Sequence, residues 1–114
     1  MKLLPHEELA LQMIFRGQDE LSIEMRNRIE SAEVLSREHT DIGFFANIKL
    51  VPHLSMVPEI RIREFNFDHP AFPYGGSYMC WFDSPDLIEI EAVTLGGVNW
   101  PNIVDHNLFS EIGI

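Results

Sequence analysis

The spacing of apolar residues changes from helical to alternating about a third of the way along the chain. In the first part, Leu9, Met13 and Ile14 recur at helical intervals after Pro5, which predicts a helix at about residues 5–16. A second helix is expected at about residues 19–32, with one face lined by Leu21, Met25, Ile29 and Ala32. Both helices are amphipathic, so each needs an apolar surface to cover.

Alternating segments in the rest of the chain predict that surface. We expect strands at about residues 42–51, 58–67, 76–83 and 86–95. In the second of these, the alternation predicts that Ile60 and Ile62 face the core and that Arg61 and Arg63 face the solvent. A sheet with one wet face is typically antiparallel.

Two stretches of turn residues separate the later strands. Residues 68–76 contain two prolines and two glycines, which predicts the longest irregular loop of the chain, because neither residue type suits a strand ladder. The short stretch 83–86 predicts a tight hairpin. In the strand that follows, Ile88 and Ile90 alternate with carboxylates, which places those carboxylates on the exposed side.

Together these patterns predict an α+β fold, in which two N-terminal helices pack on one face of a four- to five-stranded, mainly antiparallel sheet. A chain of 114 residues is near the common size of one domain, so we expect a single domain over residues 1–114. Cys80 is the one cysteine and lies in an apolar run, which is typical of an inert core thiol in a reducing compartment.

Charge is distributed unevenly along the chain. Every lysine and arginine lies at or before Arg63, whereas residues 64–114 contain eight carboxylates. Most of the formal net charge of -10 therefore belongs to the second half. Such a field attracts a basic partner and repels nucleic acid, anionic membranes and phosphorylated substrates over a Debye length of about 8 Å. We expect a basic protein as the partner, and neither nucleic acid nor a membrane.

The N-terminal residues and the hydropathy predict a soluble, cytoplasmic protein. Residues 1–8 place a proline and two carboxylates before any long apolar stretch, unlike a secretory signal peptide. No apolar run approaches the roughly 20 residues that span a bilayer.

Several groupings of polar residues have a catalytic and a simpler interpretation. On a strand, His39 and Asp41 would share one face, as a base and its orienting carboxylate do, but a surface charge cluster explains them more simply. The acid and imidazole pairs at residues 68–69 and 105–106 would bind a metal only if folded together, and neighbouring residues rarely ligate one ion well. We expect no catalytic residue, no metal ion and no cofactor.

A protein-binding surface is the interpretation that we favour for the acidic half. Tyr74 is expected to be exposed in its loop, and Trp81 to pack in the core. Glu89 and Glu91 have three interpretations: an acid/base pair, solvated strand positions, or part of an acidic face that mimics a polyanion. Aromatic residues beside carboxylates are typical of surfaces that bind basic proteins. The candidate partner-binding residues are Glu64, Asp68, Tyr74, Asp83, Asp86, Glu89 and Glu91.

In overall character, the chain resembles small acidic bacterial immunity proteins, which neutralise toxins of contact-dependent growth inhibition or bacteriocin systems. The resemblance rests on the small size, the acidic strand-rich half and the lack of a catalytic signature. The stretches Asp41–Phe45 and Leu95–Pro101 also look similar to patterns in small uncharacterised bacterial proteins. The resemblance implies a cytoplasmic inhibitor that covers the active-site cleft of a toxin, often a nuclease with a basic surface.

Two other functions remain open at the level of the sequence. A small-ligand binder or an enzyme would use a pocket between residues 68–76 and 98–107, with His69, His106 and nearby acids. A homo-oligomer would use the strands rich in Val, Phe and Trp as its own interface. For the isolated protein we expect a monomer or a weak dimer.

Overall fold

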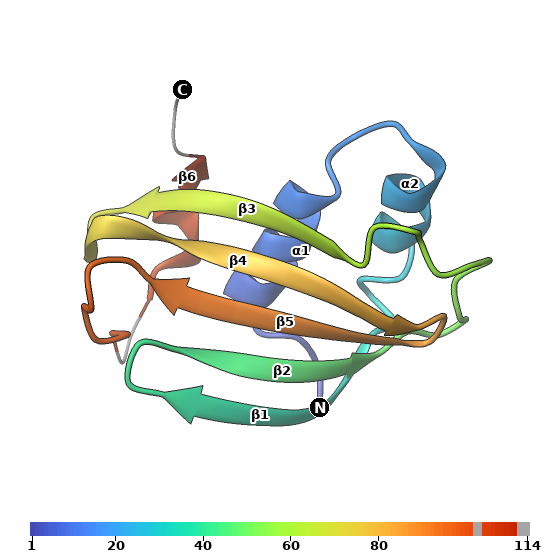
Figure 1. The fold of residues 1–114 in the computed structure, drawn as a ribbon, viewed down its shortest axis with the longest axis horizontal. Helices are drawn as coiled ribbons and strands as arrows, with labels where there is room; N and C mark the ends of the chain where they lie inside the picture. Colours follow the sequence, from blue (N-terminus) through green and yellow to red (C-terminus); the bar gives the residue numbers. More distant parts are fainter. Residues whose placement is uncertain (102–103, 112–114) are drawn as a thin grey trace.

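The computed structural model describes residues 1–101 and 104–111, and within them two helices lie on one side of a six-stranded antiparallel sheet (Figure 1). The helices are α1 (Pro5–Ile14) and α2 (Glu20–Arg26). The strands are β1 (Glu33–Thr40), β2 (Gly43–Lys49), β3 (Ile62–His69), β4 (Phe72–Ser84), β5 (Leu87–Thr94) and β6 (Ser110–Glu111), and the 3-10 turn η1 (His106–Leu108) precedes β6. The expected α+β class is confirmed.

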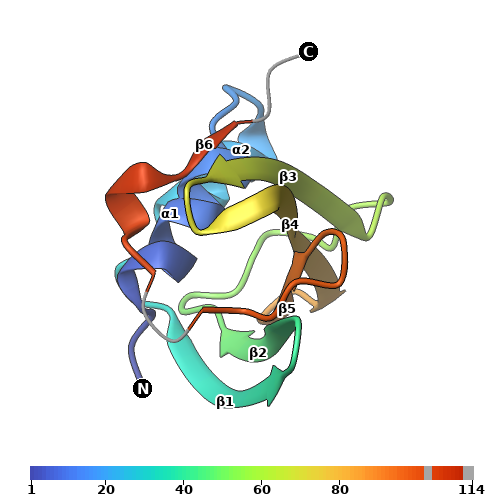
Figure 2. The same cartoon turned by 90° about the vertical axis from the view of Figure 1, so that its left-hand side faces the viewer.

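The strands follow the order β1-β2-β5-β4-β3-β6, and every neighbouring pair is antiparallel. Strands β3, β4 and β5 form a meander, and the β1–β2 hairpin joins it through β2 and β5. Figure 2 shows that the sheet curls around α1. Gly43 permits the close approach of β2 to β5, because a Cβ atom at this position would collide with the carbonyl oxygen of Ala92.

The hydrophobic core lies between α1 and the concave inner face of the sheet. In β5, Ile88, Ile90 and Ala92 are buried and alternate with half-buried carboxylates, as the sequence predicts. Each buried aliphatic side chain stabilises the fold by about 1.5–3 kcal/mol. No helix among the described residues is long and apolar enough to cross a membrane.

An aromatic cluster at one end of the core holds the C-terminal segment against the sheet. Phe67 contacts Phe109 edge-on with 4.8 Å between ring centroids, and Phe72 contacts Trp100 in the same way at 4.9 Å. Such geometries match the positive edge of one ring to the negative face of the other. The backbone N–H of Trp100 also donates to the carbonyl of Asp41 at 2.9 Å. The tail is therefore fixed to the turn between β1 and β2.

The second helix is shorter than expected, and strand β1 is not expected from the sequence pattern. Helix α2 ends at Arg26 instead of continuing to about residue 32, and tighter bonds follow, such as Arg28 N–H to the carbonyl of Met25 at 3.0 Å. Ile29 and Ala32 are still buried, because the successive turns after α2 keep nearly the same spacing of side chains as a helix. Strand β1 shows no clear alternation, since Val34 is its one fully buried side chain.

The expected orientation of the third strand is wrong. Ile60 is 74% exposed and lies before β3, whereas Phe65 and Phe67 are buried on the helix-covered face. The sequence 59–67 contains two conflicting alternations, and the larger phenylalanine rings determine the register because they bury more apolar area. Arg63 shares their face and therefore points toward the helices, not toward solvent.

Residues 68–76 form a tight hairpin with a bulge, not the expected long loop. His69 pairs with Phe72 and Phe67 pairs with Gly76, so three residues of β4 lie opposite one residue of β3. This bulge accommodates Pro73, which cannot donate a ladder hydrogen bond. The other expected strands are confirmed with ends shifted by a few residues, and helix α1 ends two residues earlier than expected.

A buried ion pair joins α1 to the edge strand β1. The side chain of Glu7 is fully buried, and its carboxylate accepts two hydrogen bonds from Arg37, at 2.7 Å from Nη2 and 2.9 Å from Nε. Glu7 also accepts from the backbone N–H of Leu4 at 2.7 Å, which satisfies a donor at the start of α1. The hydrogen bonds that Arg37 donates to Glu7 raise the pKa of Arg37. Removing one partner would leave the other charge buried and unpaired.

We expect Glu7→Gln to lower the free energy of unfolding by about 3 kcal/mol, because the amide leaves the buried guanidinium without a counter-charge. Urea denaturation monitored by circular dichroism measures this change. The double variant Glu7→Gln/Arg37→Met should recover most of the loss, since it removes both charges and the glutamine can still accept from Leu4 N–H.

The matched control is Arg16→Ala, which breaks the ion pair between Arg16 and Glu111. Both partners of that pair are about half exposed, with side-chain exposures of 52% and 49%, so its loss should cost at most about 1 kcal/mol. Equal losses for the exposed and the buried pair would contradict the role assigned to Glu7.

Candidate functional site

The convex side of the sheet, opposite α1, carries the candidate site, and we term it the outer face. In Figure 1 this face of strands β1 to β5 is turned toward the viewer, and the helices lie behind the sheet. Strand pairing places one row of side chains across five strands: Glu38, Phe45, Glu91, Met79 and Glu64. The adjacent row contains Ser36, Asn47, Glu89, Trp81 and Ile62. The outer face therefore alternates carboxylates with large apolar side chains.

The carboxylates of the outer face lie close enough to repel one another. Burial raises the pKa of Glu89 above its ordinary value, and the negative charges of Asp83 and Glu91 raise it further. A raised carboxylate pKa beside like charges indicates a concentrated negative potential. A cation brought to this cluster would be attracted to several carboxylates at once.

The arginines of the strands point to the other side of the sheet. Arg37 pairs with Glu7, as described above, and Arg63 pairs with Asp19 at 3.0 Å. Arg63 also donates to Ser22 Oγ at 3.0 Å. Hydrogen bonds from Ser22 and then from Arg63 lower the pKa of Asp19 to about 2. Because these arginines are held on the helix side, they do not neutralise the outer face, where Lys49 lies at the end of β2.

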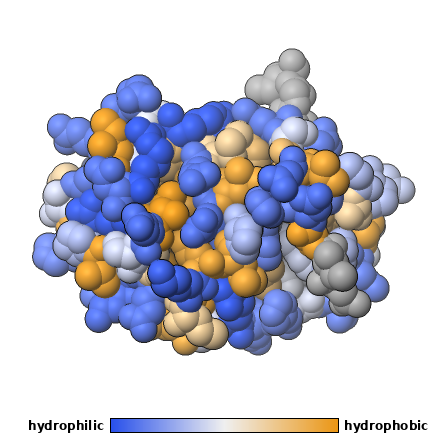
Figure 3. Space-filling view, turned by 180° about the vertical axis from the view of Figure 1, so that it is seen from behind, coloured by the Kyte–Doolittle hydropathy of each residue, from blue (hydrophilic) through white to orange (hydrophobic). Residues whose placement is uncertain are grey.

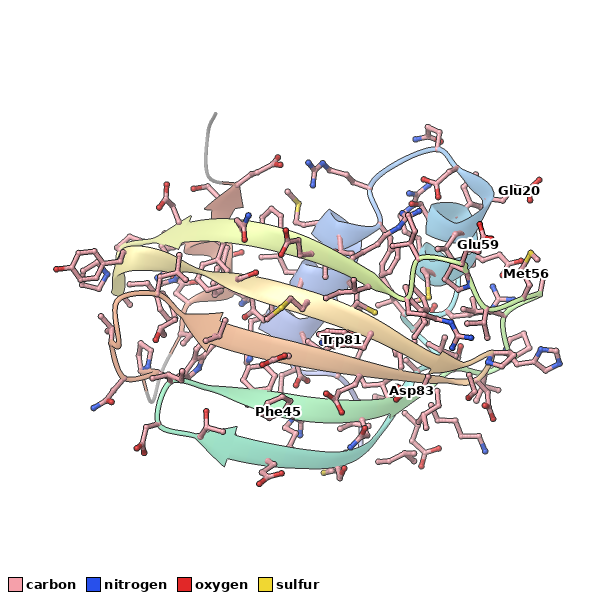
Figure 4. All side chains as sticks on the ribbon, viewed as in Figure 1. Glu20, Phe45, Met56, Glu59, Trp81 and Asp83 are labelled. Carbon is pink, nitrogen blue, oxygen red and sulfur yellow. The ribbon has the colours of Figure 1, made fainter. Side chains whose placement is uncertain are left out.

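Large apolar side chains lie among the carboxylates of the outer face. Trp81 is 39% exposed on this face, so the expectation that it packs in the core is wrong. Figure 4 shows Trp81 and Phe45 on neighbouring parts of the sheet, with Asp83 toward one end. A hollow of about 440 Å³ lies beside them, lined by Ser36, Glu38, Phe45, Asn47 and Glu89, with Arg37 at its border.

The structure brings most of the candidate partner-binding residues together. Glu64, Glu89 and Glu91 occupy neighbouring outer-face positions, and Asp83 lies at the end of that face. Asp68 also faces outward, but it lies near the other end of β3, beside the hairpin that contains Tyr74. Asp86 is in the adjoining turn, where it accepts a hydrogen bond from Ser84 Oγ at 2.9 Å.

Tyr74 is not part of this group. It is 67% exposed, as expected, but it lies near the opposite end of β4. A strand rises about 3.3 Å per residue, so the tyrosine and Asp83 are about 30 Å apart.

The sequence pattern did not reveal the large apolar side chains of the outer face or one of its acids. Phe45, Met79 and Trp81 were not among the candidate residues, and neither was Glu38. The alternation of β2 contains a signal for Phe45, because Phe44, its neighbour, is buried with the core-facing residues. Glu38 lies on β1, whose strand character the sequence pattern did not reveal.

The proposed pocket around His69 and His106 is not supported by the hydrogen bonding of His69. Its Nδ1 accepts from the N–H of Ala71 at 3.0 Å, so its Nε2 donates to the carbonyl of Asp105 at 2.8 Å. Both ring nitrogens are therefore engaged within the fold. Residues 102–103 of the expected pocket lie outside the described residues.

A pocket of about 330 Å³ lies elsewhere, between the start of α1, the end of the β1–β2 hairpin, and the segment that contains Trp100. His39, one of the candidate polar residues, lines it. Figure 3 shows the helix-covered side of the molecule, where hydrophobic atoms are visible between hydrophilic ones. This pocket and the outer face are on opposite sides of the sheet.

The described residues contain no group of three or more His, Cys, Asp or Glu side chains placed to hold a metal ion. Cys80 is fully buried, and burial raises the pKa of its thiol. A thiol with a raised pKa in an apolar core is a weak nucleophile.

Comparison of the chain with protein-family models, with curated proteins and with solved structures found no match.

We expect Glu89→Gln to stabilise the protein at neutral pH. The pKa of Glu89 is raised in the folded state, so the ionised Glu89 side chain destabilises the fold. This destabilisation is absent below the ordinary pKa of a glutamate and is complete once the pH exceeds the raised pKa of Glu89. The gain should be at most about 0.5 kcal/mol at pH near 7, because solvent screens the repulsion, and should vanish near pH 4. Urea denaturation at both pH values measures the difference.

The control is Glu30→Gln, which removes one exposed negative charge from a position outside the sheet. A gain from Glu89→Gln that is the same at both pH values would contradict repulsion within the acidic cluster.

Proposed function

We propose that this protein is a non-catalytic inhibitor of the immunity type, which neutralises a basic toxin domain, such as a nuclease, by covering its active site with the outer face. The separation of charge across the sheet is the observation that supports this function best. Carboxylates from β1, β3, β4 and β5 share the uncovered side, while Arg37 and Arg63 are paired on the other side.

The composition of the outer face suits a protein partner better than a free ion or a small solute. Phe45 on β2 and Met79 and Trp81 on β4 are large apolar side chains. Glu89 and Glu91 on β5 lie between these two strands, and Glu38 and Glu64 lie on the strands to either side. Protein interfaces obtain most of their affinity from a few large side chains near the centre. Opposite charges at the rim accelerate association and select the partner.

The size of the face is compatible with a modest interface. Five strands about 4.8 Å apart and about 26 Å long present on the order of 500 Å². A standard interface takes about 800 Å² from each partner. The turn that contains Asp86 and the loop that contains Met56, which is 72% exposed, extend the surface at the end where Asp83 lies (Figure 4).

A basic toxin domain fits this surface better than the other occupants considered. A second copy of the chain would bring a face of the same sign, and like charges placed opposite each other cost several kcal/mol. Nucleic acid would be repelled for the same reason. A nuclease active site binds a polyanion, so a row of carboxylates is complementary to it.

We expect Glu89→Gln/Glu91→Gln to slow association with a basic nuclease domain of a bacterial toxin about tenfold at low salt, because the two charges steer encounter. Stopped-flow measurements of tryptophan fluorescence give the rate. For the unmodified protein, the association rate should fall steeply between about 0.05 and 0.5 M salt, as screening shortens the range of the field.

The matched control is Glu20→Gln/Glu30→Gln, which changes the net charge equally but leaves the outer face intact. If the control slows association as much as the outer-face variant, or if salt has no effect on the rate, docking does not use this face. If cationic nuclease domains show no binding at all, the proposed function is wrong.

A further inference from the structure

The pocket behind the sheet has a chemical character that differs from that of the outer face. It is bounded by the start of α1, by the end of the β1–β2 hairpin and by the segment that contains Trp100. Its volume of about 330 Å³ is at the lower end of the range for small-molecule sites. Because it opens on the helix side, this pocket is independent of the proposed inhibitory function.

Aromatic rings form the walls of the pocket. The ring of Phe44 lies edge-on to that of Trp100, with 5.4 Å between centroids, and edge-on to His6 at 5.5 Å. The ring of His39 is 6.2 Å from Phe44 on the other side. The backbone N–H of Trp100 donates to the Asp41 carbonyl, which fixes the backbone that carries the indole. A planar ligand could therefore contact several rings without a large rearrangement.

The polar groups that line the pocket are mainly donors. The carboxylate of Glu7 is fully buried and already accepts three hydrogen bonds, from Leu4 and twice from Arg37. The guanidinium uses Nε and Nη2 for Glu7, and its Nη1 has only a 4.0 Å contact with the sulfur of Met1. The imidazoles of His6 and His39 also line the pocket. No free carboxylate among these groups would repel an anion, so the pocket suits an anionic ligand.

We propose that the pocket binds a small aromatic carboxylate, with its ring packed against Phe44 and Trp100 and the carboxylate directed at Arg37 and the imidazoles. One guanidinium nitrogen and two imidazoles match the few acceptor positions of a carboxylate. The dianion of a phosphate would need more donors than this pocket offers.

The proposal predicts that affinity rises as the pH falls. Burial lowers the pKa of His6, and the charges facing it come from every neighbouring element: Glu7 on α1 raises the pKa, whereas Arg37 and His39 on β1 and His106 on η1 lower it. A bound carboxylate adds a negative charge beside the ring and favours its protonated form. Binding should therefore be about threefold or more tighter at pH near 5.5 than near 7.5.

The two tryptophans make a selective test possible, because they lie on opposite sides of the sheet. In Trp81→Phe, the remaining indole is that of Trp100, which lines the pocket. Titration of this variant with benzoate and with indole-3-acetate should change its fluorescence at millimolar concentration or below. The matched amides, benzamide and indole-3-acetamide, keep the ring and remove the charge, and they should bind about tenfold more weakly. Because indole probes absorb near tryptophan, chemical shifts of the Trp100 indole N–H give an independent readout.

A pocket variant and a control variant complete the test. His39 is exposed, so Trp81→Phe/His39→Ala should fold and should weaken carboxylate binding about threefold or more, because it removes a donor from the pocket. Trp81→Phe/Asn47→Ala changes the outer face and should leave carboxylate binding unchanged. Equal affinity for acids and amides, equal binding by the His39 variant, or no response of Trp100 up to about 10 mM ligand would overturn the proposal. None of these results bears on docking at the outer face.

Discussion

The ion pair between Glu7 and Arg37 is the interaction on which the arrangement of this molecule depends. It joins the first turn of α1 to an edge strand that buries little apolar surface of its own. Without this pair, β1 would be held mainly by its ladder with β2 and by the bond between Val34 N–H and the Met1 carbonyl. The pair also directs the only arginine of β1 to the helix side, and so it contributes to the polarity of both faces.

The two sides of the sheet differ because side chains of a strand alternate in direction. Cations at odd positions of β1 and β3 meet carboxylates on the helices, as Arg63 meets Asp19. Acids at the intervening positions, such as Glu38 and Glu64, have no such partner on the outer side among the described residues. A chain with a moderate number of charges can thus present one strongly acidic surface without unpaired arginines in its interior.

Sequence reasoning predicted the fold class, the final hairpin and the outward direction of Glu89 and Glu91, because β5 has one clean alternation. It did not predict β1, where exposed side chains leave no pattern. It assigned Arg63 to solvent because two alternations compete in β3 and only packing decides between them. It gave Trp81 to the core on hydrophobicity alone, although Trp81 alternates with Cys80 and Phe82, and only one face of the strand can point to the core.

The strand order β1-β2-β5-β4-β3-β6 has a consequence for how the chain assembles. Strands β3, β4 and β5 are connected by two short turns, so their pairing closes only small loops. The pairing of β2 with β5 must close a loop that contains both β3 and β4, at a larger cost in chain entropy. Local contacts generally form before such distant ones. We therefore expect the meander to be the nucleus of folding and the N-terminal hairpin to dock onto it late.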